Sequence, residues 1–400
     1  MPTQISYLVT LSGQDGPGIA GELFRALESC PVVVRDVEQV RVHGRLLLCV
    51  EIEAPTSAAV SQAEATLAAQ FDRGDVEILI TPLTGDDAPN ARDRLSVTVL
   101  APTIDARTLA SVCRRIAQCR GNIERIVRLA AYPVHSYEFA VAGSDLPELR
   151  RALADEAVRC QVDIAVQVTG LHRRSKHLIV LDADSTLLQG EVIDLMADQC
   201  GCGDEVAAVT RAAMEGTIDF EAALRQRVKL LRGLDQADIE KVRGRLLLSP
   251  GARTLVRTLK RLGYAIAVVS GGFTQVIAPL VAELGIDYLA ANELELEDGV
   301  LTGDLAGPIV DRAEKANALV RFAGQAGVPL AQTIAVGDGA NDLDMLASAG
   351  LGIAFNAKPV VREAADTALS VPYLDAILFL LGISRHEVEY ADEKEEARQP

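Results

Sequence analysis

The first 170 residues carry the same order of strand and helix patterns twice. Apolar runs typical of strands and segments with apolar residues at helical spacing follow one another as strand, helix, strand, strand, helix, strand. In the first copy these segments are 5–11, 19–29, 32–42, 46–52, 55–71 and 76–81. In the second copy they are 95–100, 107–118, 122–129, 135–142, 146–156 and 162–168. Two βαββαβ units predict two α+β, ferredoxin-like domains, which we place at 1–85 and 90–170.

A polar linker at 171–176 leads into a different pattern. The apolar run from His177 to Leu181 is typical of a strand buried on both faces of a parallel sheet. Further strands are expected at 265–269, 333–336 and 351–354, with a hairpin at 293–305. Helical spacing alternates with them at 254–262, 275–284, 312–323, 343–348 and 374–381. This alternation predicts an α/β domain with a Rossmann-like parallel sheet over residues 177–385.

One long insertion separates the first strand of this domain from the others. Residues 190–246 show no strand pattern, and apolar residues such as Val192, Leu195 and Met196 recur at helical spacing. We therefore predict a helical cap at about 190–246. Residues 386–400 form a charged tail, which we expect to be frayed.

Composition limits the class of protein. The chain has 400 residues, 49% of them hydrophobic, and a formal net charge of −17. This charge argues against a nucleic-acid partner, because phosphate backbones select basic surfaces. No segment resembles a signal peptide or reaches the roughly 18 apolar residues of a membrane span, so we expect a soluble, cytoplasmic protein without membrane contact.

The seven cysteines are odd in number and scattered along the chain. In a chain of this length they indicate reduced thiols and not a disulfide framework. Cys200 and Cys202 stand too close together for the usual zinc-binding CxxC pair, and no second pair completes four ligands. We expect no metal site there.

Polar side chains follow three strands of the predicted α/β domain. They are Asp182 and Asp184 after the first strand, Ser270 after the second, and Asp338, Asn341 and Asp342 after the strand at 333–336. The carboxyl ends of parallel strands meet at one edge of a sheet, so these groups should lie together with Lys315 from a preceding helix. Two carboxylates held as close as Asp182 and Asp184 need a cation or a shared proton.

This set of groups favours phosphoryl transfer. It supplies carboxylates for a hard cation, a hydroxyl and a lysine for phosphate oxygens, and a carboxylate that can act as nucleophile. Mg²⁺ suits an all-oxygen site with few protein ligands. Acids that only cap helix N-termini would explain any one of these positions, but they explain all three poorly.

Competing motifs fail in detail. An EF-hand loop starting at Asp182 needs Asp or Asn and then Gly where Thr186 and Leu187 stand. A dinucleotide-binding fingerprint starting at Gly337 needs Gly where Asp342 stands. No GxxxxGK[ST] sequence accompanies the acids, so an ATP-binding P-loop is not expected.

The ordered motifs resemble those of haloacid dehalogenase (HAD)-type phosphatases. The matching residues are Asp182-Ala-Asp184-Ser-Thr186, Ser270-Gly271-Gly272, Lys315 and Gly337-Asp338-Gly339-Ala-Asn341-Asp342. Over 176–385 the detail is similar to the members that hydrolyse phosphoserine, with added matches at Glu191, Met214, Gly216, Phe220 and Arg227. The resemblance implies Mg²⁺-dependent hydrolysis of O-phospho-L-serine to L-serine and phosphate, the last step of L-serine biosynthesis.

The resemblance also implies a role for each residue at the strand ends. Asp182 attacks phosphorus and becomes an aspartyl-phosphate, and Asp184 passes protons as general acid and base. The metal is held by Asp182, the backbone carbonyl of Asp184, and Asp338, with Asp342 in support. Phosphate oxygens are bound by Ser270 and Lys315, assisted by Asn341 and the backbone of Gly271.

In the cap, the resemblance implies substrate contacts. Glu191 pairs with the substrate ammonium, and Arg227 binds the carboxylate with its planar fork. Met214 and Phe220 exclude water as the cap closes. Without the resemblance, Glu191 and Arg227 would be interpreted as solvated helix residues. Arg225 cannot share a helix face with Arg227 and is expected at the surface.

The two N-terminal units resemble ACT domains, small modules that often pair and bind amino acids. The matching residues are Asp15-Gly16-Pro17-Gly18, between the first strand and helix, whereas the corresponding stretch Ala101–Ala106 has no glycine. The resemblance implies L-serine or another amino acid as effector at Asp15 and Gly18, and a homodimer formed through these units. Alternatively, both units serve only dimerisation.

Two other functions remain open for the whole chain. One is a HAD phosphatase or phosphotransferase that acts on another small phosphate ester. The other is an amino-acid sensor whose phosphatase domain is inert.

Overall fold

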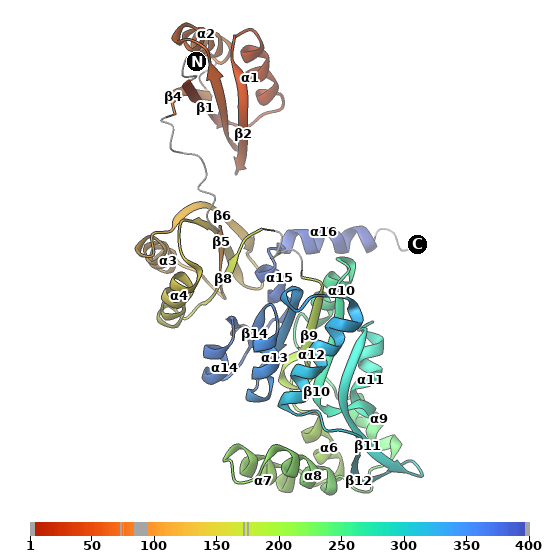
Figure 1. The fold of residues 1–400 in the computed structure, drawn as a ribbon. Helices are drawn as coiled ribbons and strands as arrows, with labels where there is room; N and C mark the ends of the chain where they lie inside the picture. Colours follow the sequence, from red (N-terminus) through yellow and green to blue (C-terminus); the bar gives the residue numbers. More distant parts are fainter. Residues whose placement is uncertain are drawn as a thin grey trace. The chain divides into compact units, whose positions relative to one another are not determined.

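The structure, a computed structural model, describes residues 5–72, 74, 76–83, 94–170, 173 and 176–396. The chain divides into two compact units, Met1–Ala91 and Arg92–Pro400, and each is described by itself. Among the described residues, no helix combines the length and the apolar character needed to cross a membrane. Figure 1 gives the element labels used below.

The first unit has the predicted βαββαβ order. Its elements are β1 (Ile5–Gln14), α1 (Ile19–Glu28), β2 (Val33–Val42), β3 (Arg45–Ala54), α2 (Ser57–Gln70) and β4 (Val76–Pro82). They form one antiparallel sheet in the order β2-β3-β1-β4. Alternate residues of β3, including Leu48 and Val50, are fully buried and pack with Leu23 of α1 and Leu67 of α2. Helices and sheet thus share one core.

The second βαββαβ domain begins the second unit. Its elements are β5 (Leu95–Ala101), α3 (Ala106–Gln118), β6 (Asn122–Ala130), β7 (His135–Ala142), α4 (Leu146–Cys160) and β8 (Asp163–Val168). The sheet order is β6-β7-β5-β8. Every residue of β5 is buried, including Ser96 and Thr98. Both faces of this sheet are therefore covered, one by its own helices and the other by the α/β domain.

The α/β domain is built on a seven-stranded sheet in the order β12-β11-β10-β9-β13-β14-β15. The strands are β9 (Leu178–Asp182), β10 (Ala265–Phe273), β11 (Tyr288–Glu297), β12 (Val300–Ala306), β13 (Thr333–Gly337), β14 (Gly352–Phe355) and β15 (Thr367–Leu369). All neighbours are parallel except β11 and β12, which form the predicted hairpin. The Rossmann-like sheet is confirmed.

Helices cover both faces of this sheet (Figure 1). The helices outside the cap are α10 (Ala252–Arg261), α11 (Thr274–Glu283), α12 (Arg312–Ala326), α13 (Leu343–Ser348), α14 (Pro359–Ala364), α15 (Ile377–Leu380) and α16 (Arg385–Glu396). The last of them, α16, lies beside α10 and β6 and not on a face of this sheet. In β9, Ile179 and Leu181 face one hydrophobic cluster, and Leu178 and Val180 face the other. The continuous apolar run of β9 is explained by these two covered faces.

The cap is helical, as predicted. It consists of α6 (Val192–Cys200), α7 (Gly203–Met214), α8 (Phe220–Leu230) and α9 (Gln236–Arg243). The chain enters and leaves the cap side by side, because Leu188 and Leu248 form an isolated antiparallel bridge. The cap is thus joined to the sheet through two adjacent segments.

The expectation that every cysteine is a free thiol is wrong for one pair. Cys200 and Cys202 form a disulfide that joins the end of α6 to the start of α7. Gly201 between them has φ 74°, the left-handed conformation that lets the chain turn back so tightly. The other five cysteines are free.

The expectation of a frayed tail is wrong for 385–396, which form α16. Asp392 of this helix pairs with Arg257 and Arg261 of α10. The pattern also did not predict the short elements α14 and β15. Short elements are stabilised by their neighbours more than by their own sequence.

Hydrogen bonds fasten the second βαββαβ domain to the α/β domain. The carbonyl of Leu380 accepts from Gln167 of β8 at 2.9 Å and from Nε of Arg173 at 3.1 Å. The backbone N–H of Ser370 donates to the buried carboxylate of Asp163 at 2.6 Å. Arg173 also pairs with Glu138 of β7 at 2.6 Å. These two domains therefore form one body.

Candidate active site

Asp182 lies at the carboxyl end of the central strand. The residue is 3% exposed, and Ala183 donates its backbone N–H to Oδ1 at 2.9 Å. The chain then bends sharply at Ser185, whose φ of 58° is unusual for a residue with a side chain. This bend turns the residues after Ser185 away from the strand direction and toward the cap.

Lys315 of α12 is buried beneath Asp182. Its ammonium lies 2.7 Å from Oδ1 of Asp182 and 2.7 Å from Oδ1 of Asp342. Burial alone would lower the pKa of Lys315, but the two carboxylates outweigh it and raise the pKa. The lysine is therefore a permanent cation at the base of the site.

Three carboxylates gather at this point. Oxygen atoms of Asp182, Asp338 and Asp342 lie within 4.8 Å of one another. Burial and the charge of Asp342 raise the pKa of Asp338 to about 6, and burial raises that of Asp182 well above its usual range. Three acids thus face one ammonium, and an all-oxygen donor set with this surplus of negative charge fits Mg²⁺.

Asp342 has less freedom than the other two acids. Its Oδ1 accepts from Lys315, and its Oδ2 accepts the backbone N–H of Gly339 at 2.9 Å. A Cβ added to Gly337 would lie 2.4 Å from Cγ of Asp342, so glycine is required there. These contacts suit a supporting role for Asp342.

The carboxylate of Asp184 has hydrogen-bond partners of its own. Its Oδ1 accepts the backbone N–H of Val192 at 2.7 Å, and its Oδ2 accepts from the hydroxyl of Ser270 at 3.2 Å. Burial raises its pKa. Asp184 therefore lies between the start of the cap and the end of β10, where it can carry a proton.

Ser270 is fully buried at the end of β10. Its Oγ accepts the backbone N–H of Gly272 at 2.8 Å. A Cβ on Gly272 would lie 3.0 Å from this oxygen and 3.1 Å from Oδ2 of Asp184. The Ser270–Gly272 segment thus places a hydroxyl group, and backbone that no side chain covers, close to Asp184.

Asn292 supports this segment, and the sequence analysis did not identify it. It is 1% exposed, donates from Nδ2 to the carbonyl of Gly271 at 2.8 Å and accepts the N–H of Val310 at 2.8 Å. A buried amide within an otherwise strand-like segment was the available signal. Asn341, which was predicted, is half-buried beside Gly339.

Residues of the cap reach the same acids. Although Glu191 keeps solvent contact, partial burial and the carboxylates of Asp184, Asp338 and Asp194 raise its pKa to about 7. Arg227 of α8 opposes that shift. The two cap residues of opposite charge therefore lie near each other and near the strand ends.

Phe220 and Met214 stand at helix ends in the cap. Phe220 begins α8 and is 37% exposed, and a Cβ on Gly271 would lie 3.8 Å from its ring. Met214 ends α7, and its side chain lies outside the described part of the chain. Arg225 is exposed and pairs with Glu221 at 2.8 Å, which confirms the prediction of a surface residue.

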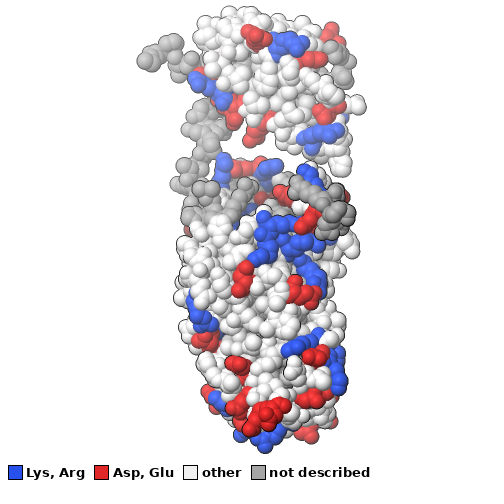
Figure 2. Space-filling view, turned by 90° about the vertical axis from the view of Figure 1, so that its right-hand side faces the viewer, with Lys and Arg blue, Asp and Glu red and all other residues white. Residues whose placement is uncertain are grey.

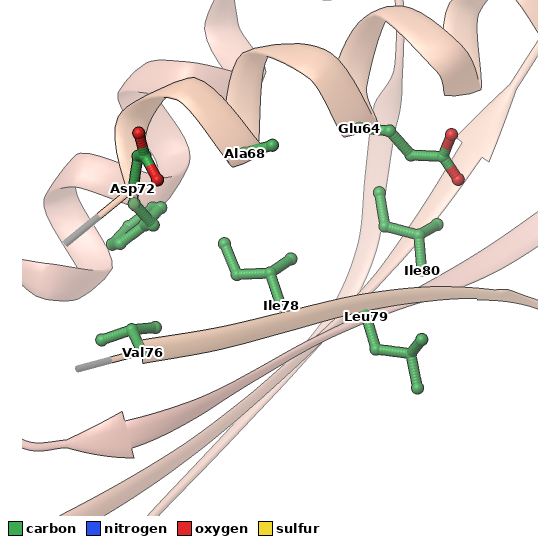
Figure 3. A pocket seen from close by; sticks show the side chains of 8 residues that line it. Glu64, Ala68, Asp72, Val76, Ile78, Leu79 and Ile80 are labelled. Carbon is green, nitrogen blue, oxygen red and sulfur yellow. The ribbon is translucent and has the colours of Figure 1, made fainter. Parts of the chain in front are cut away.

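The predicted effector loop lies in the first unit. The carboxylate of Asp15 is 2.5 Å from Nε of Arg41, and Gly18 has φ 96° where α1 begins. A hollow of about 430 Å³ lies elsewhere in this unit, between α2 and β4 (Figure 3). Ile78 and Ile80 line its apolar side, and the acids Glu64 and Asp72 stand at its helix side.

Charged side chains of both signs share the surface. On the face drawn in Figure 2, basic side chains lie beside acidic ones. The chain as a whole has 56 acidic and 39 basic residues.

Comparison with known families divides the chain in three. Residues 179–347 match the haloacid dehalogenase-like hydrolases, and residues 6–81 and 95–167 each match the ACT domains. The HAD match covers the cap and the sheet from β9 to β13, and the ACT matches cover the two βαββαβ domains.

Relatives match nearly the whole chain. A phosphoserine phosphatase of Streptomyces coelicolor is 54% identical over 97% of this chain and 94% of its own. The phosphoserine phosphatase SerB2 of Mycobacterium tuberculosis is 47% identical over 98% of this chain and 97% of its own. Among solved structures, a HAD family hydrolase of Salmonella enterica serovar Typhi is 32% identical, covers 72% of this chain and 98% of its own, and superposes with a TM-score of 0.65. The chain therefore belongs to the phosphoserine phosphatase family, with a HAD domain preceded by two ACT domains.

Proposed function

We propose that the chain hydrolyses O-phospho-L-serine to L-serine and phosphate, as the last step of L-serine biosynthesis. One observation carries the proposal. Glu191 of the cap lies close enough to Asp184 and Asp338 for their charges to raise its pKa, and Arg227 lies close enough to oppose the rise. Glu191, which suits an ammonium, and Arg227, which suits a carboxylate, therefore lie near the strand-end residues that would bind the phosphate.

In the first step, an oxygen of Asp182 attacks phosphorus. The bond between phosphorus and the serine oxygen breaks, and an aspartyl-phosphate forms. Asp184, whose pKa is raised by burial, gives its proton to the departing serine oxygen. Serine leaves as a neutral alcohol.

In the second step, water attacks the same phosphorus. Asp184, now ionised, takes a proton from that water, and the bond between phosphorus and Asp182 breaks. Phosphate leaves, and both acids return to their starting state. Splitting the hydrolysis into two displacements lets one pair of acids serve both halves.

The remaining strand-end residues hold the phosphoryl group. Ser270, Lys315, Asn341 and the backbone of Gly271 are proposed to bind its oxygens. Asp182, Asp338 and the backbone carbonyl of Asp184 would hold Mg²⁺, with Asp342 in support. The metal, when bound, neutralises charge on the phosphoryl oxygens and on the acids.

Substrate selection is assigned to the cap. Glu191 receives the ammonium and Arg227 the carboxylate of phosphoserine. Phe220 and Met214 would exclude water from the phosphoryl group when the cap closes. The contact of the Phe220 ring with the Gly271 position supports this role for Phe220.

Phosphate release from a panel of esters tests the proposal. We expect phosphoserine to be preferred over other small phosphate esters, with activity that requires Mg²⁺ and is abolished in Asp182→Asn. Activity on another ester alone would favour the broader phosphatase function. No release from any ester would favour an amino-acid sensor with an inert phosphatase domain.

We also propose that L-serine or a related amino acid binds the ACT domains near Asp15 and Gly18, and that the chain is a homodimer. The free backbone groups at the start of α1 support an amino-acid carboxylate there. Calorimetry on the full chain carrying Asp182→Asn should show a binding heat with L-serine that Asp15→Ala removes.

Light scattering tests the homodimer, because it measures the mass of the particle in solution.

A further inference from the structure

Arg227 is held on the buried side of the cap. It follows Leu224 by three positions and precedes Val228, and both of these side chains are at most 1% exposed. Arg225, on the other side of α8, is exposed. The helix therefore directs Arg227 toward α7, which packs against α8 (Figure 1).

One hydroxyl group anchors the guanidinium of Arg227. Its Nη1 donates to Oγ1 of Thr210 of α7 at 3.5 Å. Its Nε is buried and has no hydrogen-bond partner among the described residues. The guanidinium is thus hydrogen-bonded through Nη1, while the edge formed by Nε and Nη2 is left for another acceptor.

Three carboxylates act on the charge of Arg227 without forming an ion pair with it among the described residues. Glu191, Asp194 and Asp184 are close enough to act on its charge, yet within the described residues it forms no ion pair. Burial next to acids would normally lead an arginine to pair with one of them. Here the hydrogen-bond partner of Arg227 among the described residues is the hydroxyl of Thr210.

We propose that Thr210 is a positioning residue for substrate specificity, which holds Arg227 so that its free edge faces the carboxylate of the substrate. The inference rests on the proposed function, because it requires a substrate with a carboxylate. The chemical class it selects is an α-amino acid phosphate ester, as opposed to an amine phosphate ester.

A neutral hydroxyl suits this task better than an acid. A carboxylate at position 210 would neutralise Arg227 and compete with the substrate, whereas a hydroxyl orients the guanidinium and leaves its charge intact. The branched side chain of threonine also has few rotamers in a helix, so the anchor itself is stiff. Holding a flexible arginine in its bound orientation reduces the entropy lost on binding.

The test compares two esters on the full-length enzyme with Mg²⁺ present. O-phospho-L-serine has the carboxylate, and O-phosphoethanolamine has the same phosphate and ammonium without it. In Thr210→Val, which removes the hydroxyl and keeps the shape, we expect KM for phosphoserine to rise roughly three- to tenfold, the usual effect of one hydrogen bond. We expect kcat to stay within about twofold and KM for phosphoethanolamine to change by less than about twofold.

Three further variants complete the design. Thr210→Ser, which keeps the hydroxyl, should behave nearly as wild type. Arg227→Ala should raise KM for phosphoserine more than Thr210→Val does. Arg225→Ala, two residues away and exposed, should change neither ester.

Two kinds of result would overturn the inference, and they can be told apart. Equal effects of Thr210→Val on both esters, or no effect while Arg227→Ala remains selective, would reject positioning by Thr210 and leave the proposed function standing. A wild-type enzyme that does not distinguish the two esters would reject the substrate assignment itself, and the inference with it.

Discussion

The ammonium of Lys315 lies 2.7 Å from the carboxylate of Asp182, at the end of the central strand. The same ammonium is also 2.7 Å from Asp342, so one cation serves two buried acids. Asp182 has to be ionised to attack phosphorus, and burial alone would favour its neutral form. Lys315 therefore favours the ionised form of Asp182, which is the form that attacks phosphorus.

We expect Lys315→Met to abolish phosphatase activity and to lower the free energy of unfolding by about 3–5 kcal/mol, because it leaves buried acids without their partner. Urea denaturation followed by circular dichroism measures the second effect. Lys260→Met, at an exposed lysine paired with Asp287, is the matched control and should cost less than about 1 kcal/mol. Equal losses in the two variants would contradict the assigned role of Lys315.

Mg²⁺ should stabilise the folded chain. A ligand that binds only the folded state at 100 times its dissociation constant adds about 2.7 kcal/mol to the free energy of unfolding. We expect the melting temperature to rise with Mg²⁺ and to fall again with EDTA, and Asp338→Asn to remove most of the response. Glu297→Gln, at an exposed acid of the hairpin, should keep it. An undiminished response in Asp338→Asn would place the metal elsewhere.

Substrate binding should depend on pH through Glu191. Its pKa is raised to about 7, so the carboxylate is increasingly neutral below that pH and loses its attraction for an ammonium. We expect KM for phosphoserine to fall as the pH rises toward 7, with a somewhat lower midpoint when Mg²⁺ offsets the charge of Asp338. In Glu191→Gln the part of this dependence that comes from Glu191 should disappear.

The phosphate group of the substrate also titrates, near pH 6, and needs its own control. Phosphoglycolate has no ammonium, so its KM should follow only the phosphate titration in both proteins. A profile for phosphoserine that is the same in wild type and Glu191→Gln would argue against ammonium binding by Glu191.

Glu156 should make the stability of the second ACT domain depend on pH. Burial would raise its pKa, but hydrogen bonds with Ser111, Arg159 and Cys160 outweigh burial and hold the pKa at about 2. An acid with a lowered pKa stabilises the fold above its ordinary pKa, and this contribution is lost as the pH falls toward 2.

Glu156→Gln should therefore lower the free energy of unfolding by about 1–3 kcal/mol at pH 7 and by less at pH 3. Chemical denaturation at the two pH values measures the difference. Asp155→Asn, on the exposed side of the same helix, is the control. A penalty for Glu156→Gln that does not shrink at pH 3 would mean that the charge of Glu156 is not the stabilising feature.

Much of this fold was predictable because its signals are local. The apolar run of β9 and the acids after it predicted both the parallel sheet and the edge where the site lies. Helix spacing placed Arg225 and Arg227 on different faces of α8, whereas the substrate role of Arg227 came from the family resemblance. Each of these signals spans fewer than ten residues, and the packing agrees with the local preference.

What could not be predicted depends on partners far apart in the chain. The tail is mostly charged, and its helix packs Val388 into the core and pairs Asp392 with Arg257 and Arg261, more than 130 residues earlier. Asn292 belongs to the site only because its amide donates a hydrogen bond to the carbonyl of Gly271 on the neighbouring strand β10. The Cys200–Cys202 disulfide required the tight turn at Gly201.

The two ACT domains differ in how freely their sequences can change. The second one is tied to the catalytic domain, because Gln167 and Arg173 donate hydrogen bonds to the carbonyl of Leu380. Substitutions in the second domain that alter β8 also disturb the end of the catalytic sheet, so a new regulatory response there is constrained by the folding of the enzyme. The first domain has its own core and can diverge more freely. Adaptation of the chain to a different metabolic signal would therefore be easier to achieve in residues 5–83.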